Sequence, residues 1–165
     1  MNVMKSADNV FYAHSKEGAP VEKWQKLETH LKNVAGLAGE FADVFGARQW
    51  GYVAGLWHDL GKYSELFQRK LIRENTNEAS EEISQGKVNH SSAGGWYAMQ
   101  KLPRGHALVL SYLIMGHHAG LTDYHSEYAG NASLEKRMRE SEGVNLLLKR
   151  IPDHILNIDP PRELI

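Results

Sequence analysis

Apolar residues recur at steps of three and four along much of the chain, the spacing that places side chains on one face of an α-helix. The first run is the longest and predicts one amphipathic helix that ends near Gly46. Its apolar positions are Trp24, Leu27, Leu31, Val34, Ala38, Phe41 and Phe45. A second predicted helix ends near Gly61 and carries Trp50, Val53, Ala54 and Trp57.

Shorter apolar runs predict further helices after Gly61. The third helix carries Tyr63, Leu66, Phe67 and Leu71. Residues 74–89 are polar, which is typical of a mobile loop. Ser91 or Ser92 is expected to cap a helix that extends to Leu102, because a serine hydroxyl can accept a hydrogen bond from the first turn.

The second half of the chain also lacks strand signals. Residues 106–116 are strongly apolar and are expected in the core, followed by a loop over about 118–131. Ser133 is expected to cap a charged helix that extends to about Arg150 and is weakened in its middle by Gly143. No segment alternates between apolar and polar residues as a strand would. The pattern therefore predicts an all-α helical bundle.

The composition adds that this is one soluble domain. A chain of 165 residues with 42% hydrophobic and 24% charged residues is typical of a single globular domain. Lys and Arg number 19 against 20 Asp and Glu, so any basic groove for nucleic acid would have to be local. The N-terminus lacks the apolar core of a signal peptide, and no apolar stretch is long enough to span a bilayer. We therefore expect a cytoplasmic protein with no membrane contact.

Histidine is unusually frequent, with nine residues, whereas cysteine is absent. A metal site would therefore be built from imidazole and carboxylate groups. The strongest local feature is His58-Asp59, shortly before Gly61. At a helix end, such neighbouring side chains can converge on one divalent ion, although a His-Asp pair alone is common by chance. Four histidines in terminal, polar or helix-opening positions are expected mostly at the surface: His14, His106, His125 and His154.

Other histidines lie at three further predicted helix edges. His30 borders the first apolar stripe, where a histidine is more often a core residue than a ligand. His90 opens the small-residue segment HSSAGG, which is equally typical of a helix start. His117 and His118 lie between two glycines after the apolar helix and would also suit a helix C-terminus. Together with Asp59, these imidazoles favour a metal site, because each buried imidazole needs a partner.

In this order the motifs resemble a known family. His30 followed by His58-Asp59 is similar to the start of the HD phosphohydrolase signature, whose members are all-α, metal-dependent phosphoesterases. More narrowly, the chain resembles the HD nuclease domain of the type I CRISPR interference helicase–nuclease. The matching stretches run from residue 11 to about 123: FYAHS, WQKLETHLKNVAGLAGEFA, AGLWHDLGKYSELFQRKL, HSSAGG and LSYLIMGHHAGLTD. The resemblance implies an HD-domain helical bundle.

The resemblance also implies an activity and a ligand set. Domains of this family cut single-stranded DNA that the CRISPR guide-RNA effector complex displaces, and they use two clustered metal ions. By position, His30, His58 and Asp59 would bind the first ion, and Asp59 would bridge to the second. The second ion would be bound by Asp59, His90, His117 and His118.

Further residues are implied to contact the substrate. Lys62, catalytic together with Asp59, would face the scissile phosphate. Ser91 and Ser92 lie beside a ligand and are weaker candidates for supporting the metals or contacting phosphate. Weaker candidates for contacts with the DNA backbone are Arg69, Lys70 and Arg73, and the alternative for these three is a solvated helix face.

The expected cofactors are one or two divalent transition-metal ions. Two ions about 3.5–4 Å apart can activate water and stabilise the leaving 3′-oxygen of a phosphodiester. Imidazole-rich ligation favours Mn, Fe, Co or Ni over Mg, which prefers oxygen ligands and water.

One part of the family pattern is missing from the sequence. HD proteins carry a further aspartate on a late helix, which binds the first metal. Asp123 follows the double histidine too closely, and Asp153 and Asp159 lie in a Pro-flanked tail. We therefore expect residues 1–165 to form a single HD nuclease domain that lacks its C-terminal part. A superfamily 2-type helicase would be fused or separate, and the second metal would bind more tightly than the first.

The sequence is also compatible with two alternative functions. The chain could be an HD phosphohydrolase that acts on nucleotides or a cyclic dinucleotide. It could also be a catalytically incomplete module that docks on a helicase or effector complex, as the missing aspartate and the net charge of −1 indicate.

Overall fold

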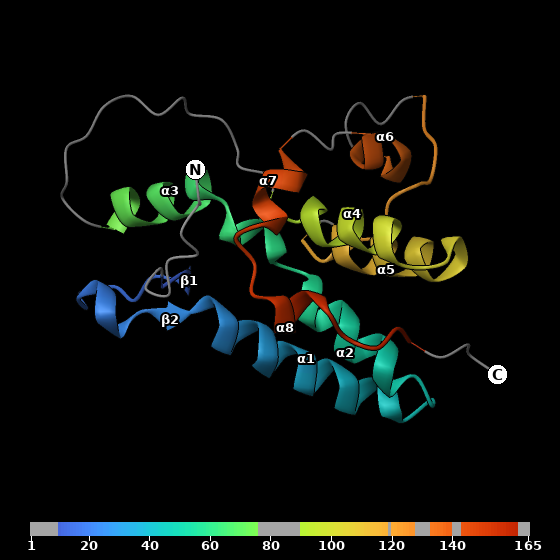
Figure 1. Ribbon diagram of the computed structural model, residues 1–165, viewed down its shortest axis with the longest axis horizontal. Helices are drawn as coiled ribbons and strands as arrows, with labels where there is room; N and C mark the ends of the chain where they lie inside the picture. The colour runs from blue at the N-terminus through green and yellow to red at the C-terminus, as the bar shows by residue number, and fades with distance from the viewer. Residues whose placement is uncertain (1–9, 76–89, 119, 128–132, 140–142, 162–165) are drawn as a thin grey trace.

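The computed structural model describes residues 10–75, 90–118, 120–127, 133–139 and 143–161. In this part of the chain, helices pack around one core and a single pair of short strands lies at one side (Figure 1). The predicted all-α class is therefore confirmed. None of the described helices is long and apolar enough to cross a membrane.

Helices α1 (Leu27–Asp43) and α2 (Arg48–Trp57) form a closely packed antiparallel pair. The turn between them contains Gly46, whose positive φ of 74° ends the first helix as predicted. A Cβ atom at Gly55 would lie 2.8 Å from the Cα atom of Ala35, so only glycine allows the two backbones to approach this closely. The close contact fixes the end of α2, where the His-Asp pair follows.

The predicted apolar stripe of the first helix is partly wrong. Phe41 and Phe45 are 72% and 73% exposed, and Trp24 lies before α1, next to the 3-10 turn η1 (Val21–Lys23). The buried residues of α1 are Leu27, Leu31, Ala35, Gly39 and Ala42. Small residues occupy the contact with α2 because the helices are too close for phenylalanine side chains, so the buried face is turned away from the largest apolar residues.

The next elements close the core over α2. A 3-10 turn, η2 (Leu60–Tyr63), leads into α3 (Glu65–Asn75), and the antiparallel pair α4 (Ser92–Lys101) and α5 (Arg104–Gly116) follows. Helix α3 includes residues 74 and 75, which were predicted to be loop; residues 76–89 lie outside the described part. Ser91 is the N-cap of α4 as predicted, although its side chain makes no capping hydrogen bond.

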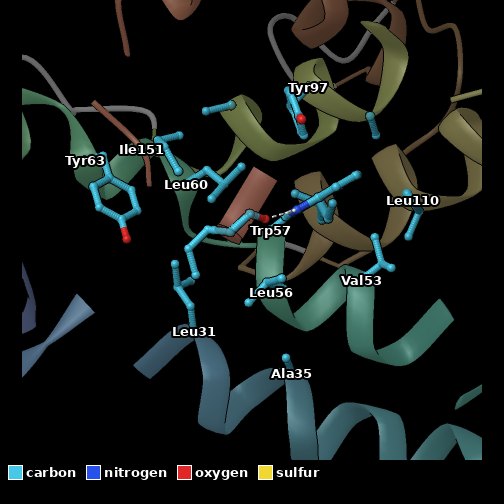
Figure 2. Packing of buried hydrophobic residues seen from close by; sticks show 14 of the residues in the cluster. Leu31, Ala35, Val53, Leu56, Trp57, Leu60, Tyr63, Tyr97, Leu110 and Ile151 are labelled. Carbon is cyan, nitrogen blue, oxygen red and sulfur yellow. Dashed lines mark hydrogen bonds between the residues drawn. The ribbon is translucent and has the colours of Figure 1, made fainter. Parts of the chain in front are cut away.

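Trp57 lies at the centre of the core (Figure 2). Its ring packs edge-on against Tyr97 of α4, with 4.8 Å between ring centroids. Its Nε1–H donates at 3.0 Å to the carbonyl of Ile155, which lies in the short helix α8 (Asp153–Leu156). Trp57, the residue immediately before the His-Asp pair, is thus fixed by contacts with both α4 and α8.

The predicted single helix from Ser133 to Arg150 is wrong. The structure has two short helices instead, α6 (Leu134–Arg139) and α7 (Val144–Leu148). Gly143 has a φ of 80°, which a right-handed helix cannot accommodate, so α7 starts anew after it.

The strand pair was not predicted. Strands β1 (Tyr12–His14) and β2 (Gln25–Lys26) pair antiparallel, with Tyr12 opposite Lys26. Segments of three and two residues are too short to show alternation in a sequence. The pair lies beside the N-terminal end of α1 (Figure 1).

Candidate metal centre

The His-Asp pair lies where α2 ends, and the helix end itself orients the histidine. His58 is the C-cap of α2, and its Nδ1 lies 2.7 Å from the carbonyl oxygen of Gly55, one of the carbonyls left free at a helix end. A carbonyl only accepts hydrogen bonds, so Nδ1 of His58 carries a proton. In the neutral imidazole, Nε2 therefore presents a lone pair towards the centre.

Helix α5 repeats this arrangement. His117 is its C-cap, and Nδ1 of His117 lies 2.5 Å from the carbonyl oxygen of Ile114. The Nε2 atom of neutral His117 is again a lone-pair donor. Histidine ligands of metals commonly hold their second nitrogen in this way, with the N–H donated to a backbone carbonyl.

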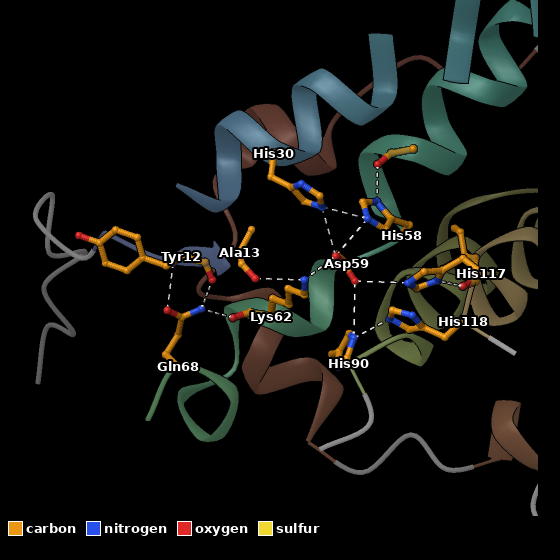
Figure 3. Close-up of polar contacts among 12 residues, drawn as sticks. Tyr12, Ala13, His30, His58, Asp59, Lys62, Gln68, His90, His117 and His118 are labelled. Atoms are coloured by element: carbon orange, nitrogen blue, oxygen red, sulfur yellow. Dashed lines mark hydrogen bonds and ion pairs between the residues drawn. The ribbon is translucent and has the colours of Figure 1, made fainter. Parts of the chain in front are cut away.

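Asp59 lies between the two helix ends and is only 2% exposed. Its Oδ2 atom is 3.0 Å from Nε2 of His58 and 3.3 Å from Nε2 of His30. Its Oδ1 atom faces the other way, 3.5 Å from Nε2 of His117 and 3.8 Å from Nε2 of His90. Each carboxylate oxygen thus serves a different set of imidazoles (Figure 3).

The described residues contain two groups that could hold a metal ion, and Asp59 belongs to both. We call His30, His58 and Asp59 the first group, and Asp59, His90, His117 and His118 the second group. Within each group the potential ligand atoms lie within 4.8 Å of one another. The structure thus brings together the six residues that were expected as ligands. Asp59 is the one carboxylate in these groups; Asp123, Asp153 and Asp159 belong to neither.

The donor atoms fit a bound cation. Oδ1 of Asp59 is buried and accepts no hydrogen bond from the residues that the structure describes. The lone pairs of neutral His58 and His117 point at the same carboxylate, and electron pairs cannot attract one another. Nε2 of His90 also lies 2.8 Å from Nε2 of His118. Such an arrangement requires a proton or a metal ion between the donors.

The imidazoles and the carboxylate of the centre also shift one another's pKa values. Burial of the Asp59 carboxyl favours its neutral form, but the imidazoles of His117, His30 and His58 outweigh burial and hold the pKa of Asp59 well below its usual range. Burial opposes protonation of His117, yet Asp59 and the Ile114 carbonyl raise its pKa.

His118 behaves in the opposite way. Burial, together with the positive charge that His117 and His90 can carry, lowers the pKa of His118. Protons therefore compete with a metal more strongly at His117, which faces the carboxylate directly, than at His118.

Two glycines hold the His-Asp turn against the segment that begins at His90. A Cβ atom at Gly61 would lie 2.2 Å from the carbonyl oxygen of His90, and one at Gly94 would lie 1.9 Å from that of Trp57. Neither position has room for a side chain. This contact between η2 and the start of α4 brings His90 to the Asp59 carboxylate.

Lys62 is placed differently from the expectation that it faces the substrate. It is only 4% exposed, and its ammonium group lies 2.9 Å from Oδ2 of Asp59. It also donates to the backbone carbonyl of Ala13 at 3.1 Å. Because η2 folds back under Asp59, the side chain fills the interior between the carboxylate and strand β1. Lys62 therefore orients Asp59 from the inner side.

The remaining candidates do not line the centre directly. Ser91 and Ser92 are buried beside His90, so they are better placed to support this residue than to meet a phosphate from solvent. On α3, Arg69 pairs with Glu65, and the Nζ atom of Lys70 lies 3.7 Å from Glu74.

Arg73, in the last turn of α3, is half-buried. With two of its three candidate cations paired to its own acidic residues, α3 is closer to the alternative of a solvated helix face than to a dedicated DNA-binding surface.

Sequence reasoning missed two residues near the centre. His14 was expected mostly at the surface; it is exposed, but its ring lies 5.0 Å from that of His30, centroid to centroid. Gln68 binds strand β1 through its side-chain amide. The segment FYAHS was the one signal available for His14, and nothing in the sequence distinguishes Gln68.

The other histidines lie away from the two groups. His106 stacks on Trp50 with 5.0 Å between ring centroids, His125 pairs with Glu135 at 2.7 Å, and Nε2 of His154 lies 2.9 Å from Glu28. Each has a partner that explains its position without a metal.

A helical bundle whose centre joins a His-Asp pair to histidines from three other segments defines the HD class of domains, which bind divalent metals. The family model described as "Cas3, HD domain" matches residues 13–157, and the chain belongs to this family of CRISPR-associated HD nucleases. The predicted resemblance is therefore confirmed, and the family implies a hydrolase with a nucleic-acid substrate in a CRISPR effector context. A search of curated proteins found no match.

Proposed function

We propose that this chain is a metal-dependent nuclease that hydrolyses phosphodiester bonds of single-stranded DNA during CRISPR interference. The observation that carries the proposal is the single buried carboxylate of Asp59, shared between two histidine groups. A carboxylate between two sets of imidazoles is suited to holding two divalent ions close together. The family adds the CRISPR context and the class of substrate.

The residues around Asp59 have distinct roles in this proposal. The first and second groups would each hold one divalent ion, which when bound supplies a nucleophile from water and neutralises charge on the phosphate. His58 and His117 keep their Nδ1 protons on backbone carbonyls, so their Nε2 atoms stay directed at the centre. Lys62 pairs with the Asp59 carboxylate at 2.9 Å and keeps it in a fixed orientation.

The donor set also indicates which metals suit the centre. Imidazole-rich ligation favours Mn, Fe, Co or Ni, whereas Mg prefers oxygen ligands and water. The second group offers four donor residues and the first offers three. We therefore propose that the second group binds its ion more tightly.

A single strand suits this centre better than a duplex. Its phosphodiesters can reach a site at the ends of helices one at a time, whereas a rigid duplex depends on an extended basic surface. The net charge of −1 and the paired Arg69 and Lys70 do not favour such a surface. A superfamily 2-type helicase, fused or separate, and the guide-RNA effector complex would supply the single strand.

The test is cleavage of an end-labelled single-stranded oligonucleotide by the purified chain with Mn, Co, Ni or Mg, paired with elemental analysis of bound metal. We expect cleavage with the transition metals and loss of both cleavage and metal in Asp59→Ala. Asp123→Ala is the matched control, because Asp123 is an exposed aspartate outside both groups.

Two results would overturn the proposal. Hydrolysis of nucleotides without DNA cleavage would show a nucleotide phosphohydrolase. DNA cleavage that survives Asp59→Ala would show that the centre is not the source of the activity, and a module that docks on a partner would then be favoured.

A further inference from the structure

Strand β1 brings one more histidine, His14, next to His30 of the first group, and this histidine is exposed. The ring of His14 lies 5.0 Å from the ring of His30, centroid to centroid, and the two planes are 81° apart. His30 in turn lies 3.3 Å from Asp59. His14 does not belong to the first group, whose ligand atoms are mutually within 4.8 Å. It is a neighbour of the ligands rather than one of them.

Two side chains hold β1 at this place (Figure 3). The ammonium of Lys62 joins the carbonyl of Ala13 to Asp59. The amide of Gln68 pairs with Tyr12 as a neighbouring strand would: its Oε1 atom accepts from the backbone N–H at 3.0 Å, and its Nε2 atom donates to the backbone carbonyl at 2.9 Å. The same Nε2 atom lies 2.8 Å from the carbonyl of Lys62.

The alternation of the strand then directs His14 outwards. Ala13 is buried in the core, and His14, the next residue, is exposed. An isolated two-stranded pair is marginal by itself, so polar anchors at Tyr12 and Ala13 are what fix the strand beside the centre. The contacts of Gln68 with Tyr12 and of Lys62 with Ala13 therefore hold the exposed imidazole of His14 beside His30.

We propose that His14 is a substrate-binding residue of this centre, whose imidazole N–H donates a hydrogen bond to a non-bridging oxygen of the phosphodiester. The inference rests on the proposed function. Lys62 cannot make this contact, because its ammonium is buried between Asp59 and Ala13. A neutral imidazole always retains one N–H group, so the contact needs no change of protonation. Gln68 is the positioning residue that holds His14 in place.

The test compares His14→Ala with His125→Ala, an exposed histidine paired with Glu135 far along the chain. Binding of a fluorescent single-stranded oligodeoxythymidine with natural phosphodiester linkages is measured by anisotropy in the presence of a chelator, so that the strand is not cut, and bound metal is measured by elemental analysis of separate samples. A hydrogen bond to a charged oxygen predicts about ten-fold weaker DNA binding for His14→Ala. Metal content should stay at the wild-type level, and His125→Ala should bind DNA normally.

Gln68→Leu keeps the size of the side chain and removes the amide. It should weaken DNA binding in the same direction, and the double variant His14→Ala, Gln68→Leu should bind no more weakly than His14→Ala alone, because both changes act on one contact. Additive losses would assign Gln68 a separate structural role and would contradict its part in the inference.

Unchanged DNA binding in His14→Ala would overturn the inference, and so would loss of a metal ion in this variant, which would make His14 a ligand. Hydrolysis of the small diester bis(p-nitrophenyl) phosphate separates failure of the inference about His14 from failure of the proposed function. If the wild type hydrolyses this diester but not DNA, the nuclease proposal fails. His14 then stands only if its replacement raises the KM for the diester.

Discussion

The two groups around Asp59 share a carboxylate but are built differently. In the first group, His30 and His58 come from the closely packed pair α1 and α2, and their side chains are 14% and 13% exposed. In the second group, His90 and His117 come from segments at the start of α4 and the end of α5, and are 22% and 21% exposed. The first group thus lies between two closely packed helices, whereas the second is formed by helix ends that are more open to solvent.

The two groups therefore depend on different features of the structure. Packing of the central helices holds the first group, which has three ligand residues, and a larger donor set compensates for the more open position of the second. Asp59 couples them, because each of its oxygens faces one group. A change in the core should therefore affect the first group, a change at η2 or α5 the second, and a change at Asp59 both.

The largest effect is expected for Asp59→Ala, which removes the residue common to both groups. Activity should fall by more than the roughly 100-fold seen when a residue that only supports a metal ligand is changed. The buried ammonium of Lys62 also loses its partner, so the free energy of unfolding of the metal-free protein should fall by about 3–5 kcal/mol. Urea denaturation and a cleavage assay measure the two effects.

The double variant Asp59→Ala, Lys62→Met separates these two effects. It leaves no unpaired buried charge, so it should regain most of the lost stability without regaining activity. If stability and activity returned together, Asp59 would be a structural residue alone.

Gly61→Ala should affect the second group selectively. Its Cβ atom would overlap the carbonyl of His90, so the His90 segment must move away from Asp59. We expect loss of the metal bound at the second group, retention of the first, and destabilisation by about 1–3 kcal/mol. Gly36→Ala is the control: this glycine lies within α1 with nothing near its Cβ position, so the change should stabilise the protein by roughly 0.5–1 kcal/mol.

His30→Ala and His118→Ala test the order of metal affinity. Each removes one donor from one group only. If the second group binds its ion more tightly, calorimetric titration of the metal-free wild type with Mn or Co should show a tight and a weak phase. His118→Ala should then lose the tight phase and His30→Ala the weak one, with the affinity of the affected phase falling at least roughly ten-fold. The reverse assignment would contradict the proposed order.

The smallest expected effect is on the pH dependence of stability in the metal-free protein. The pKa of His118 is lowered in the folded state, so its contribution to stability is lost as pH falls below the unfolded value of about 6.5. The pKa of His117 is raised, so its contribution is present below about pH 6.5 and is lost as pH rises through the folded value.

Replacing the two histidines should therefore change the slope with opposite signs. His118→Ala should reduce the rise of the free energy of unfolding with pH, and His117→Ala should increase it. Urea denaturation between pH 5.5 and 8 with a chelator present measures both slopes, and equal signs would contradict this assignment of charges.

Much of the fold and of the candidate site could be predicted, because the histidines and the aspartate of the site lie in short motifs at the ends of helices. The period of apolar residues predicted the helices around the centre, and the glycine after α1 predicted where that helix stops. The segments with His58, His90 and His117 are short and distinctive, so their order was sufficient to identify the family, which the comparison with the family model confirms.

Other features depend on contacts that no local pattern contains. Phe41 was placed in the core by its spacing, yet it is exposed because the glycines of α2 bring the helices too close for a large side chain. Lys62 was expected to face the substrate, yet it is buried, because its place depends on the carbonyl of Ala13, which lies 49 residues away in the sequence.

The sequence by itself determined that this protein is a helical HD domain with imidazole and carboxylate groups at the ends of its helices, since helix periodicity and short motifs are local properties. The tertiary structure alone decided which oxygen of Asp59 faces which histidines, and that Lys62 is turned inwards while His14 is brought beside His30. These relations depend on how closely separate helices pack, and that distance is set by side-chain volumes on both partners at once.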